Sequence, residues 1–137
     1  MVSDSARQEV RERAGAVCEY CRMPEHLSSA SFHVDHIIAT SHEGDDDVSN
    51  YAWSCILCNL AKGPNVGSFD GESSTFVRLF NPRADSWEEH FEWRGAMIVG
   101  KTEIGRVTVS VLQMNKPKRI ETRRILIELG RFFNEHG

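Results

Sequence analysis

Four cysteines are the side chains of this sequence best suited to bind a metal. They form two Cys-x-x-Cys pairs, Cys18 with Cys21 and Cys55 with Cys58. Each pair can place two thiolates about 2.3 Å from one zinc ion, and four thiolates complete the closed tetrahedral shell of a structural site. Because that shell has no open position, we expect the zinc to hold the fold and other side chains to perform any chemistry.

The polar residues bracketed by these cysteines are suited to hydrolysis. Asp35, His36 and Asn50 lie between the pairs, and Asn59 follows the last cysteine. Carboxylate and amide oxygens suit Mg²⁺ or Mn²⁺, and an imidazole that is not a ligand can take a proton from water. Hydrolysis of a phosphodiester needs a cation to offset charge and a base to activate water. These four side chains therefore predict phosphodiester hydrolysis.

Local patterns predict the elements that position these side chains. Residues 32–38 predict a short, partly buried strand that carries Asp35 and His36, and residues 51–54 predict a second strand paired with it. The intervening residues 39–50 lack apolar periodicity and predict a surface loop. The expected order is a strand, a loop, a strand, a zinc knuckle and a short helix that ends at a Gly-Pro pair.

The flanking segments give weaker patterns. A Ser-x-x-Gln capping box at Ser5 predicts a helix over residues 3–15. Residues 87–99 predict a hairpin with an aromatic face, and residues 104–115 favour a helix over a strand. Residues 119–134 predict a helix whose apolar face is formed by Ile120, Ile125, Leu129, Phe132 and Phe133.

Length and composition indicate one compact unit. The chain has 137 residues, of which 40% are hydrophobic, which suffices for one core but not for two ordinary domains. We expect a core over residues 1–70 and a C-terminal extension over residues 71–137, packed on that core. Close cysteine pairs suit a metal in a reducing compartment, and no apolar run approaches the length of a membrane span. A soluble cytoplasmic protein without membrane contact is expected.

Charge is distributed unevenly along the chain. The formal net charge is −4, with residues 1–70 at −6 and residues 71–137 at +2. Nine basic residues and three acidic ones lie between Arg94 and Arg131. If the basic residues share a surface, they can offset phosphate charge locally. A mixed, solvated helix face explains them equally well.

The order and spacing of these motifs resemble the HNH endonucleases, which are ββα-metal nucleases. The matching stretch begins at the first cysteine pair and is followed by Phe-His-Val-Asp-His-Ile-Ile and an acidic, glycine-containing loop. It ends with Ser-Asn-Tyr-Ala-Trp-Ser-Cys-Ile-Leu-Cys-Asn-Leu-Ala-Lys-Gly. The resemblance covers about residues 15–66. With the patterns above, it implies an α+β fold in which a ββα-metal finger with a structural zinc site precedes a C-terminal hairpin and helices. A segment that begins at residues 79–83 also resembles the extension of one bacterial subgroup.

The resemblance implies a role for each polar residue. Asp35 is a ligand of the catalytic cation, and His36 is the general base. Asn50 braces the loop and orients His36 through a hydrogen bond. Asn59 stands where the family's closing histidine or asparagine binds the metal, so the motif here is His-Asn-Asn. Because an amide favours hard ions, Mg²⁺ or Mn²⁺ is expected at this site, in addition to the structural zinc.

Functions from different classes fit these residues. The first is a metal-dependent endonuclease that hydrolyses DNA phosphodiester bonds with a histidine base and one divalent cation, leaving a 5′-phosphate and a 3′-hydroxyl; RNA stays open as a substrate. The alternative is a zinc-stabilised, non-catalytic module that binds nucleic acid. A third is a protein-interaction domain built on the same scaffold. Structural explanations also exist for the site residues, such as a stabilising contact between Asp35 and His36, or helix capping by the asparagines.

Overall fold

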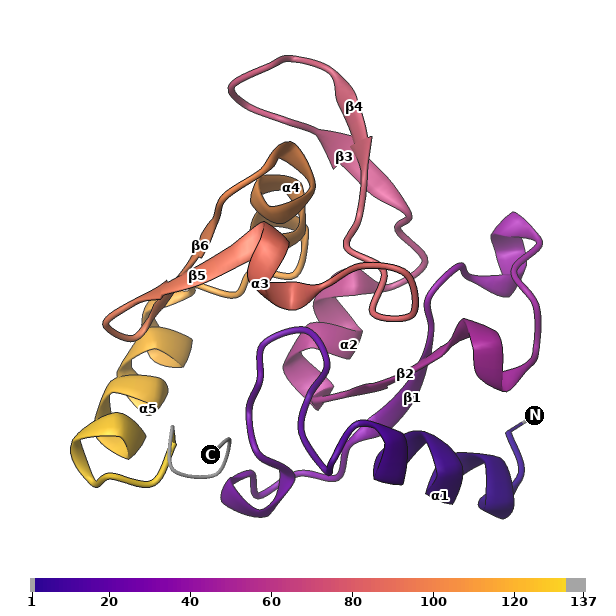
Figure 1. Cartoon of the computed structure of the whole chain (residues 1–137), viewed down its shortest axis with the longest axis horizontal. Helices are drawn as coiled ribbons and strands as arrows, with labels where there is room; N and C mark the ends of the chain where they lie inside the picture. The colour runs from indigo at the N-terminus through magenta and orange to yellow at the C-terminus, as the bar shows by residue number, and fades with distance from the viewer. Residues whose placement is uncertain (1, 133–137) are drawn as a thin grey trace.

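Short helices and two-stranded antiparallel sheets alternate along the chain in the computed structural model, which describes residues 2–132 (Figure 1). This is the mixed helix and sheet architecture that the sequence predicts at a coarse level. Within these residues, the structure contains no helix of the length and apolarity needed to span a membrane.

The strand, loop, strand and helix predicted around the candidate site follow one another in that order. The two strands pair antiparallel, which places Asp35 opposite Ala52. The helix begins directly after Cys55 and ends at Gly63, whose φ is 50°. The elements are β1 (His33–His36), η2 (Thr40–His42), η3 (Val48–Asn50), β2 (Tyr51–Ser54) and α2 (Ile56–Lys62).

The N-terminal helix, α1 (Asp4–Arg13), packs against β2. Its N-cap is Ser3, whose hydroxyl accepts a hydrogen bond of 3.1 Å from a backbone N–H of the first turn. The capping box predicted at Ser5 is wrong, because Ser5 already lies inside the helix. At the other end, the Arg13 guanidinium donates to the carbonyl of Tyr51 at 2.7 Å and so ties the helix to the hairpin.

The C-terminal half contains a hairpin that the sequence did not predict. Each of its strands has only three residues, and the first contains a glycine and a serine, which weaken a strand pattern. Two exposed rings, Phe69 and Phe76, pack edge to face with centroids 5.4 Å apart. The predicted boundary at residue 70 falls within this hairpin, so the division into core and extension stays a prediction. The remaining elements are η1 (Glu25–Leu27), β3 (Gly67–Phe69), β4 (Phe76–Arg78), α3 (Trp87–His90), β5 (Phe91–Arg94), β6 (Met97–Gly100), α4 (Glu103–Val111) and α5 (Pro117–Glu128).

Two other C-terminal predictions are confirmed in whole or in part. The helix expected after residue 104 is α4, which is capped by the Thr102 hydroxyl accepting from the Gly105 N–H at 3.0 Å. The aromatic hairpin is present as β5 and β6, but it begins only at Phe91. The preceding residues form the helical turn α3, which buries Trp87 in the core.

The apolar face predicted for the last helix is wrong. Arg119 and Arg123 are the buried side chains of α5, whereas Ile125 is 44% exposed. The helix also ends before Leu129, which is 66% exposed. The arginines can be buried because backbone carbonyls and a cysteine sulfur accept their N–H groups. Phe132 is buried beyond the helix, and the predicted Phe133 lies outside the described residues.

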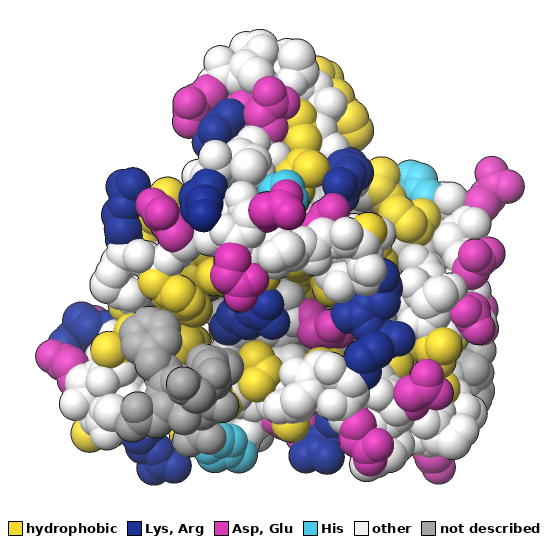
Figure 2. All heavy atoms as spheres, viewed as in Figure 1, with side chains coloured by type: hydrophobic (Ala, Val, Ile, Leu, Met, Phe, Trp, Pro, Cys, Tyr) yellow, Lys and Arg dark blue, Asp and Glu magenta, His cyan; other side chains and the backbone are white. Residues whose placement is uncertain are grey.

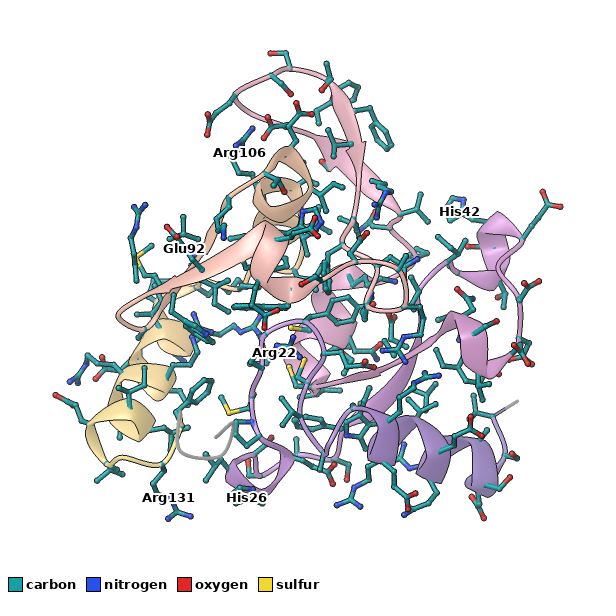
Figure 3. The ribbon with its side chains drawn as sticks, viewed as in Figure 1. Arg22, His26, His42, Glu92, Arg106 and Arg131 are labelled. Carbon is teal, nitrogen blue, oxygen red and sulfur yellow. The ribbon has the colours of Figure 1, made fainter. Side chains whose placement is uncertain are left out.

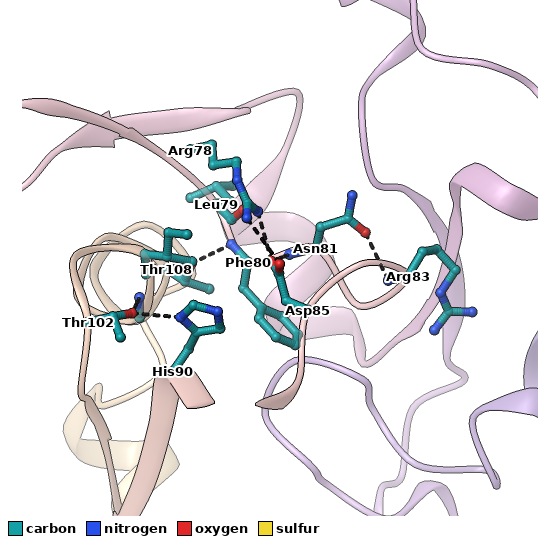
Figure 4. Close-up of polar contacts among 11 residues, drawn as sticks. Arg78, Leu79, Phe80, Asn81, Arg83, Asp85, His90, Thr102 and Thr108 are labelled. Atoms are coloured by element: carbon teal, nitrogen blue, oxygen red, sulfur yellow. Dashed lines mark hydrogen bonds and ion pairs between the residues drawn. The ribbon is translucent and has the colours of Figure 1, made fainter. Parts of the chain in front are cut away.

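The segment Leu79–Arg83, for which the sequence suggested no mechanism, is part of a hydrogen-bonded turn (Figure 4). Asp85 accepts hydrogen bonds from Arg78 at 2.8 and 3.0 Å. Arg83 forms an ion pair with Glu19 of the N-terminal half. This segment therefore fastens the C-terminal half to the segment that carries Cys18 and Cys21.

Candidate metal and catalytic site

The four cysteines lie together in the interior of the protein, as the sequence predicts. Their sulfur atoms are all within 4.8 Å of one another, and the Sγ atoms of Cys21 and Cys55 are 3.7 Å apart. Sulfur ligands placed tetrahedrally at 2.3 Å from one zinc ion stand about 3.8 Å apart. The cluster thus fits a metal such as zinc, and Figure 3 shows its sulfur atoms beside Arg22 near the centre of the view.

The acidity of the thiols also suits a bound cation. Burial raises the pKa of Cys18 and Cys58, whereas hydrogen bonds from the other thiols lower the pKa of Cys21. Four buried thiolates repel one another, so they require a cation to be ionised together. A divalent metal would meet that requirement.

Arg119 of α5 contacts this cluster and was not predicted to do so. Its Nη2 donates to the Cys58 sulfur at 3.1 Å, and its Nη1 donates to the carbonyl of Leu112 at 2.9 Å. Burial opposes the charge of Arg119, but Cys58 and Cys21 together hold its pKa above the usual value. A guanidinium here would offset part of the negative charge of a four-thiolate zinc site.

Asp35 projects from β1 into the interior and is held by two neighbours. The Tyr20 hydroxyl donates to its Oδ2 at 2.6 Å, and the Lys62 ammonium lies 3.2 Å from the same oxygen. Burial raises the pKa of the Asp35 carboxyl, and the charge of Lys62 partly offsets that effect. The Lys62 side chain is only 1% exposed, which is unusual for a lysine near the end of a helix.

His36 is the next residue of β1 and its ring is partly exposed. Nε2 lies 3.0 Å from Asp46 Oδ1, and the same carboxylate accepts the Tyr51 hydroxyl. The rings of His36 and Tyr51 meet edge to face with centroids 5.0 Å apart. Hydrogen bonds from Tyr51 and then His36 hold the pKa of Asp46 well below its usual range. Asp46 is therefore the carboxylate that holds the imidazole.

Asn50 braces the loop between the strands but contacts different groups from those expected. Its Nδ2 donates to the carbonyls of Ile38 at 2.9 Å and Asp45 at 2.8 Å, and its Oδ1 accepts from the Ile38 N–H at 2.9 Å. Both amide protons are thus used on the backbone, and Asp46 takes the place expected for Asn50 beside His36. Gly44 is required in this loop, because a Cβ there would lie 1.7 Å from the Ile38 carbonyl oxygen.

Asn59 of α2 lines the same surface hollow as Asp35 and His36. This hollow, here called the Asp35 hollow, has a volume of about 310 Å³ and is otherwise walled by the η2 segment and the Gly63-Pro64 turn. Three of the four side chains that the sequence grouped together therefore meet at one cavity, and Asn50 is not part of its lining. Two other hollows lie along the opposite side of α2, against α5, and contain none of these residues.

Apart from the buried Lys62 beside Asp35, positive charge does not gather around the Asp35 hollow. Its lining contains no lysine or arginine among the described residues. Of the nine basic residues between Arg94 and Arg131, Arg119 and Arg123 are buried, and others form ion pairs with acidic neighbours. Figure 2 shows basic and acidic side chains interspersed over the face in view. His42, labelled in Figure 3, is exposed in the loop that precedes the second strand of this site.

The two tyrosines provide a direct test of these contacts. A hydrogen bond to Asp46 raises the pKa of Tyr51 to about 12, and burial followed by the Asp35 charge raises the pKa of Tyr20. We expect little tyrosinate absorbance as the folded protein passes pH 10, the usual range for tyrosine. Because the folded protein favours neutral Tyr51, its contribution to stability is full below about pH 10 and is lost as pH rises through about 12.

An Asp46→Asn substitution serves as the control for the tyrosine titration. It should return one of the two tyrosines to a pKa of about 10 and leave the other unchanged. Two tyrosines that ionise together near pH 10 in the wild-type protein would contradict both hydrogen bonds.

Comparison with known proteins gives a family match for the segment that contains both cysteine pairs. Residues 18–65 match the family model described as HNH endonuclease. Over 103 residues the chain is 30% identical to the Septu protein PtuA of Bacillus mycoides (strain KBAB4), an alignment that covers 67% of this chain and 14% of that much longer protein. No solved structure gives a significant match. Residues 18–65 of the chain therefore match an HNH endonuclease domain.

Proposed function

We propose that the chain is a metal-dependent endonuclease that hydrolyses DNA phosphodiester bonds with His36 as the general base. The observation that carries this proposal is the meeting of Asp35, His36 and Asn59 at the Asp35 hollow. The antiparallel β1 and β2 and the following α2 supply these residues, as expected for a ββα-metal finger. The buried cysteine cluster beside them would hold a structural zinc.

His36 is placed to take a proton from water. Its side chain is 28% exposed and lines the hollow, so water can reach the ring. If Asp46 accepts a hydrogen bond from Nε2–H, the neutral ring has its lone pair on Nδ1. Nδ1 can then accept the proton of a water that attacks phosphorus. Asp46 fixes this tautomer, while Asn50 keeps the loop that carries Asp46 folded.

Asp35 and Asn59 would hold the catalytic cation. A carboxylate oxygen and an amide oxygen are hard donors, which fit Mg²⁺ or Mn²⁺ better than zinc. When bound there, the cation would neutralise phosphate charge and stabilise the departing 3′ oxygen. The products would then carry a 5′-phosphate and a 3′-hydroxyl.

The substrate must be attracted without a strongly basic cleft. The net charge of −4 and the neutral or acidic lining of the hollow give little long-range pull on a polyanion. The chain spans 14% of the length of its curated relative. We infer that further protein, or a partner, supplies much of the affinity for DNA, and that cleavage occurs in the reducing cytoplasm, where cysteine ligands persist.

Incubation with supercoiled plasmid tests this function. We expect conversion to nicked and linear DNA with Mg²⁺ or Mn²⁺ and none after brief exposure to EDTA, while elemental analysis still finds one zinc per chain. The protein with His36→Ala is run alongside. Cleavage that is equal with and without EDTA, at unchanged zinc content, would contradict a catalytic cation.

One observation favours the non-catalytic alternative. Both oxygens of Asp35 already contact Lys62, and Oδ2 also accepts the Tyr20 hydroxyl. A carboxylate satisfied in this way can serve stability alone. The alternative predicts that the chain binds nucleic acid but does not cut it under any divalent ion.

A further inference from the structure

The contacts of Asp35 are too well buried to be incidental surface pairing. Tyr20 is 0% exposed, Lys62 is 1% exposed, and Asp35 is 5% exposed. Water therefore cannot readily replace either partner, and the carboxylate is held from two sides. The Lys62 ammonium also donates to the His36 carbonyl at 3.0 Å, which fixes the backbone directly after His36.

The two cysteine pairs, residues 18–21 and 55–58, are here called the first and second knuckle, and one partner of Asp35 lies in the first and the other in the helix of the second. Tyr20 lies within the first pair, between Cys18 and Cys21. Lys62 lies in the last turn of α2, the helix that begins after Cys55. The backbone of Tyr20 is fixed in turn, because its carbonyl accepts the Trp87 indole N–H at 2.8 Å.

The two oxygens of Asp35 are not equivalent. Oδ2 accepts the Tyr20 hydroxyl at 2.6 Å and lies 3.2 Å from Lys62, whereas Oδ1 makes one longer contact of 3.3 Å, also with Lys62. Oδ1 is thus the oxygen with more capacity for a further ligand. Asp35 is one of the residues that line the hollow, so a cation bound there would lie beside this carboxylate.

We propose that Tyr20 and Lys62 are positioning residues that present Asp35 Oδ1 to the catalytic cation, so that the zinc-binding knuckles set the geometry of the catalytic site. The inference rests on the proposed function, because it concerns the same carboxylate. Two further residues would then act through Asp35, and the zinc site would position this carboxylate in addition to stabilising the fold. Partners that orient a metal ligand commonly change metal affinity tenfold to a hundredfold when removed.

Tyr20→Phe tests the proposal, since it removes one hydroxyl and keeps the buried ring. Affinity for Mn²⁺ is measured on the zinc-loaded full chain by the electron paramagnetic resonance of free Mn²⁺, which requires no cleavage. We expect binding weakened about tenfold to a hundredfold, with one zinc per chain retained. Mn²⁺ affinity equal to that of the wild-type protein would overturn the proposal, and so would a wild-type protein that binds no Mn²⁺.

Ser54→Ala is the matched control. Ser54 is fully buried beside the second knuckle, and its hydroxyl donates to the Cys55 carbonyl at 3.0 Å without contacting Asp35. Loss of this hydroxyl should leave Mn²⁺ affinity unchanged. The double variant Tyr20→Phe with Asp35→Asn should bind Mn²⁺ no more weakly than Asp35→Asn alone, because Tyr20 acts through that carboxylate. Additive losses in the double variant would overturn the assigned role.

A measurement on the wild-type protein covers the case in which Tyr20→Phe does not fold. The chain has two tyrosines, so labelling the tyrosine ring carbons gives two sets of resonances, which Tyr51→Phe assigns. Addition of Mg²⁺ should shift the Tyr20 hydroxyl-bearing carbon in the wild-type protein and not in Asp35→Asn. An unmoved signal at saturating Mg²⁺ would overturn the proposal. Tyr20-dependent Mn²⁺ binding without DNA cleavage would support the positioning role and defeat only the nuclease proposal.

Discussion

Replacing His36 with alanine is expected to slow plasmid cleavage about 10²–10⁴-fold, the usual range for loss of a positioned general base. Binding should survive, because the imidazole is not assigned as a ligand of either metal. Zinc content should also survive, since the four sulfurs lie on other residues. Gel analysis of supercoiled plasmid gives the rate, and elemental analysis gives the zinc.

His33→Ala is the matched control for this prediction. His33 is in the same strand and half-buried like His36, but it is not part of the lining of the Asp35 hollow. Its loss should change the cleavage rate little. If both variants lose activity equally, damage to the strand rather than loss of a base explains the result. If His36→Ala keeps wild-type activity, the non-catalytic alternative gains support.

Asp35→Ala separates the two metal sites. It should abolish cleavage and Mn²⁺ binding while zinc stays near one per chain, because Asp35 is not one of the clustered sulfur ligands. The substitution also leaves Lys62 buried without its partner, so stability must be followed alongside. A parallel fall in zinc would show that the two sites are not separate.

The parts of this site that could be predicted depend on short-range spacing. Two Cys-x-x-Cys pairs and a strand pattern around Asp35 and His36 are local features, and the structure places them as expected. The alternation of β1 turns Asp35 inward, and the Gly63-Pro64 pair ends α2. Each of these rests on a few adjacent residues.

The parts that could not be predicted depend on contacts distant in sequence or on unusual burial. Tyr20 and Lys62 contact Asp35 from 15 and 27 residues away in the sequence, and a lysine near the end of a helix is normally solvated. Asp46 is one of three consecutive aspartates, and only the folded loop decides which one meets His36. No pattern in the sequence distinguishes them.

The burial of two arginines of α5 could not be predicted either, because it also depends on contacts distant in sequence. A helix with regularly spaced leucine and isoleucine predicts an apolar inner face, yet Arg119 and Arg123 are buried instead. Their acceptors are carbonyls after α4, the Ala96 carbonyl and the Cys58 sulfur, none of which a local pattern can reveal. Their burial also removes two charges from the expected phosphate-binding surface.

Cys55→Ser is expected to remove the zinc and unfold the protein. Zinc binding to small structural sites supplies about 10–16 kcal/mol, comparable with the total stability of a domain, about 5–15 kcal/mol. Elemental analysis should find zinc well below one per chain, and circular dichroism should show no cooperative thermal transition. Ser54→Ala, which alters the adjacent buried residue but removes no ligand, should keep both.

The Cys55→Ser variant also tests whether the cysteine segments position the Asp35 carboxylate. Cys55 precedes α2, and the Cys21 sulfur that faces it belongs to the knuckle that contains Tyr20. Loss of the zinc should therefore release Tyr20 and Lys62 from Asp35 together and abolish Mn²⁺ binding as well. A folded Cys55→Ser protein without zinc would contradict the structural metal site. One that also bound Mn²⁺ normally would show that Asp35 is positioned independently of the cysteines.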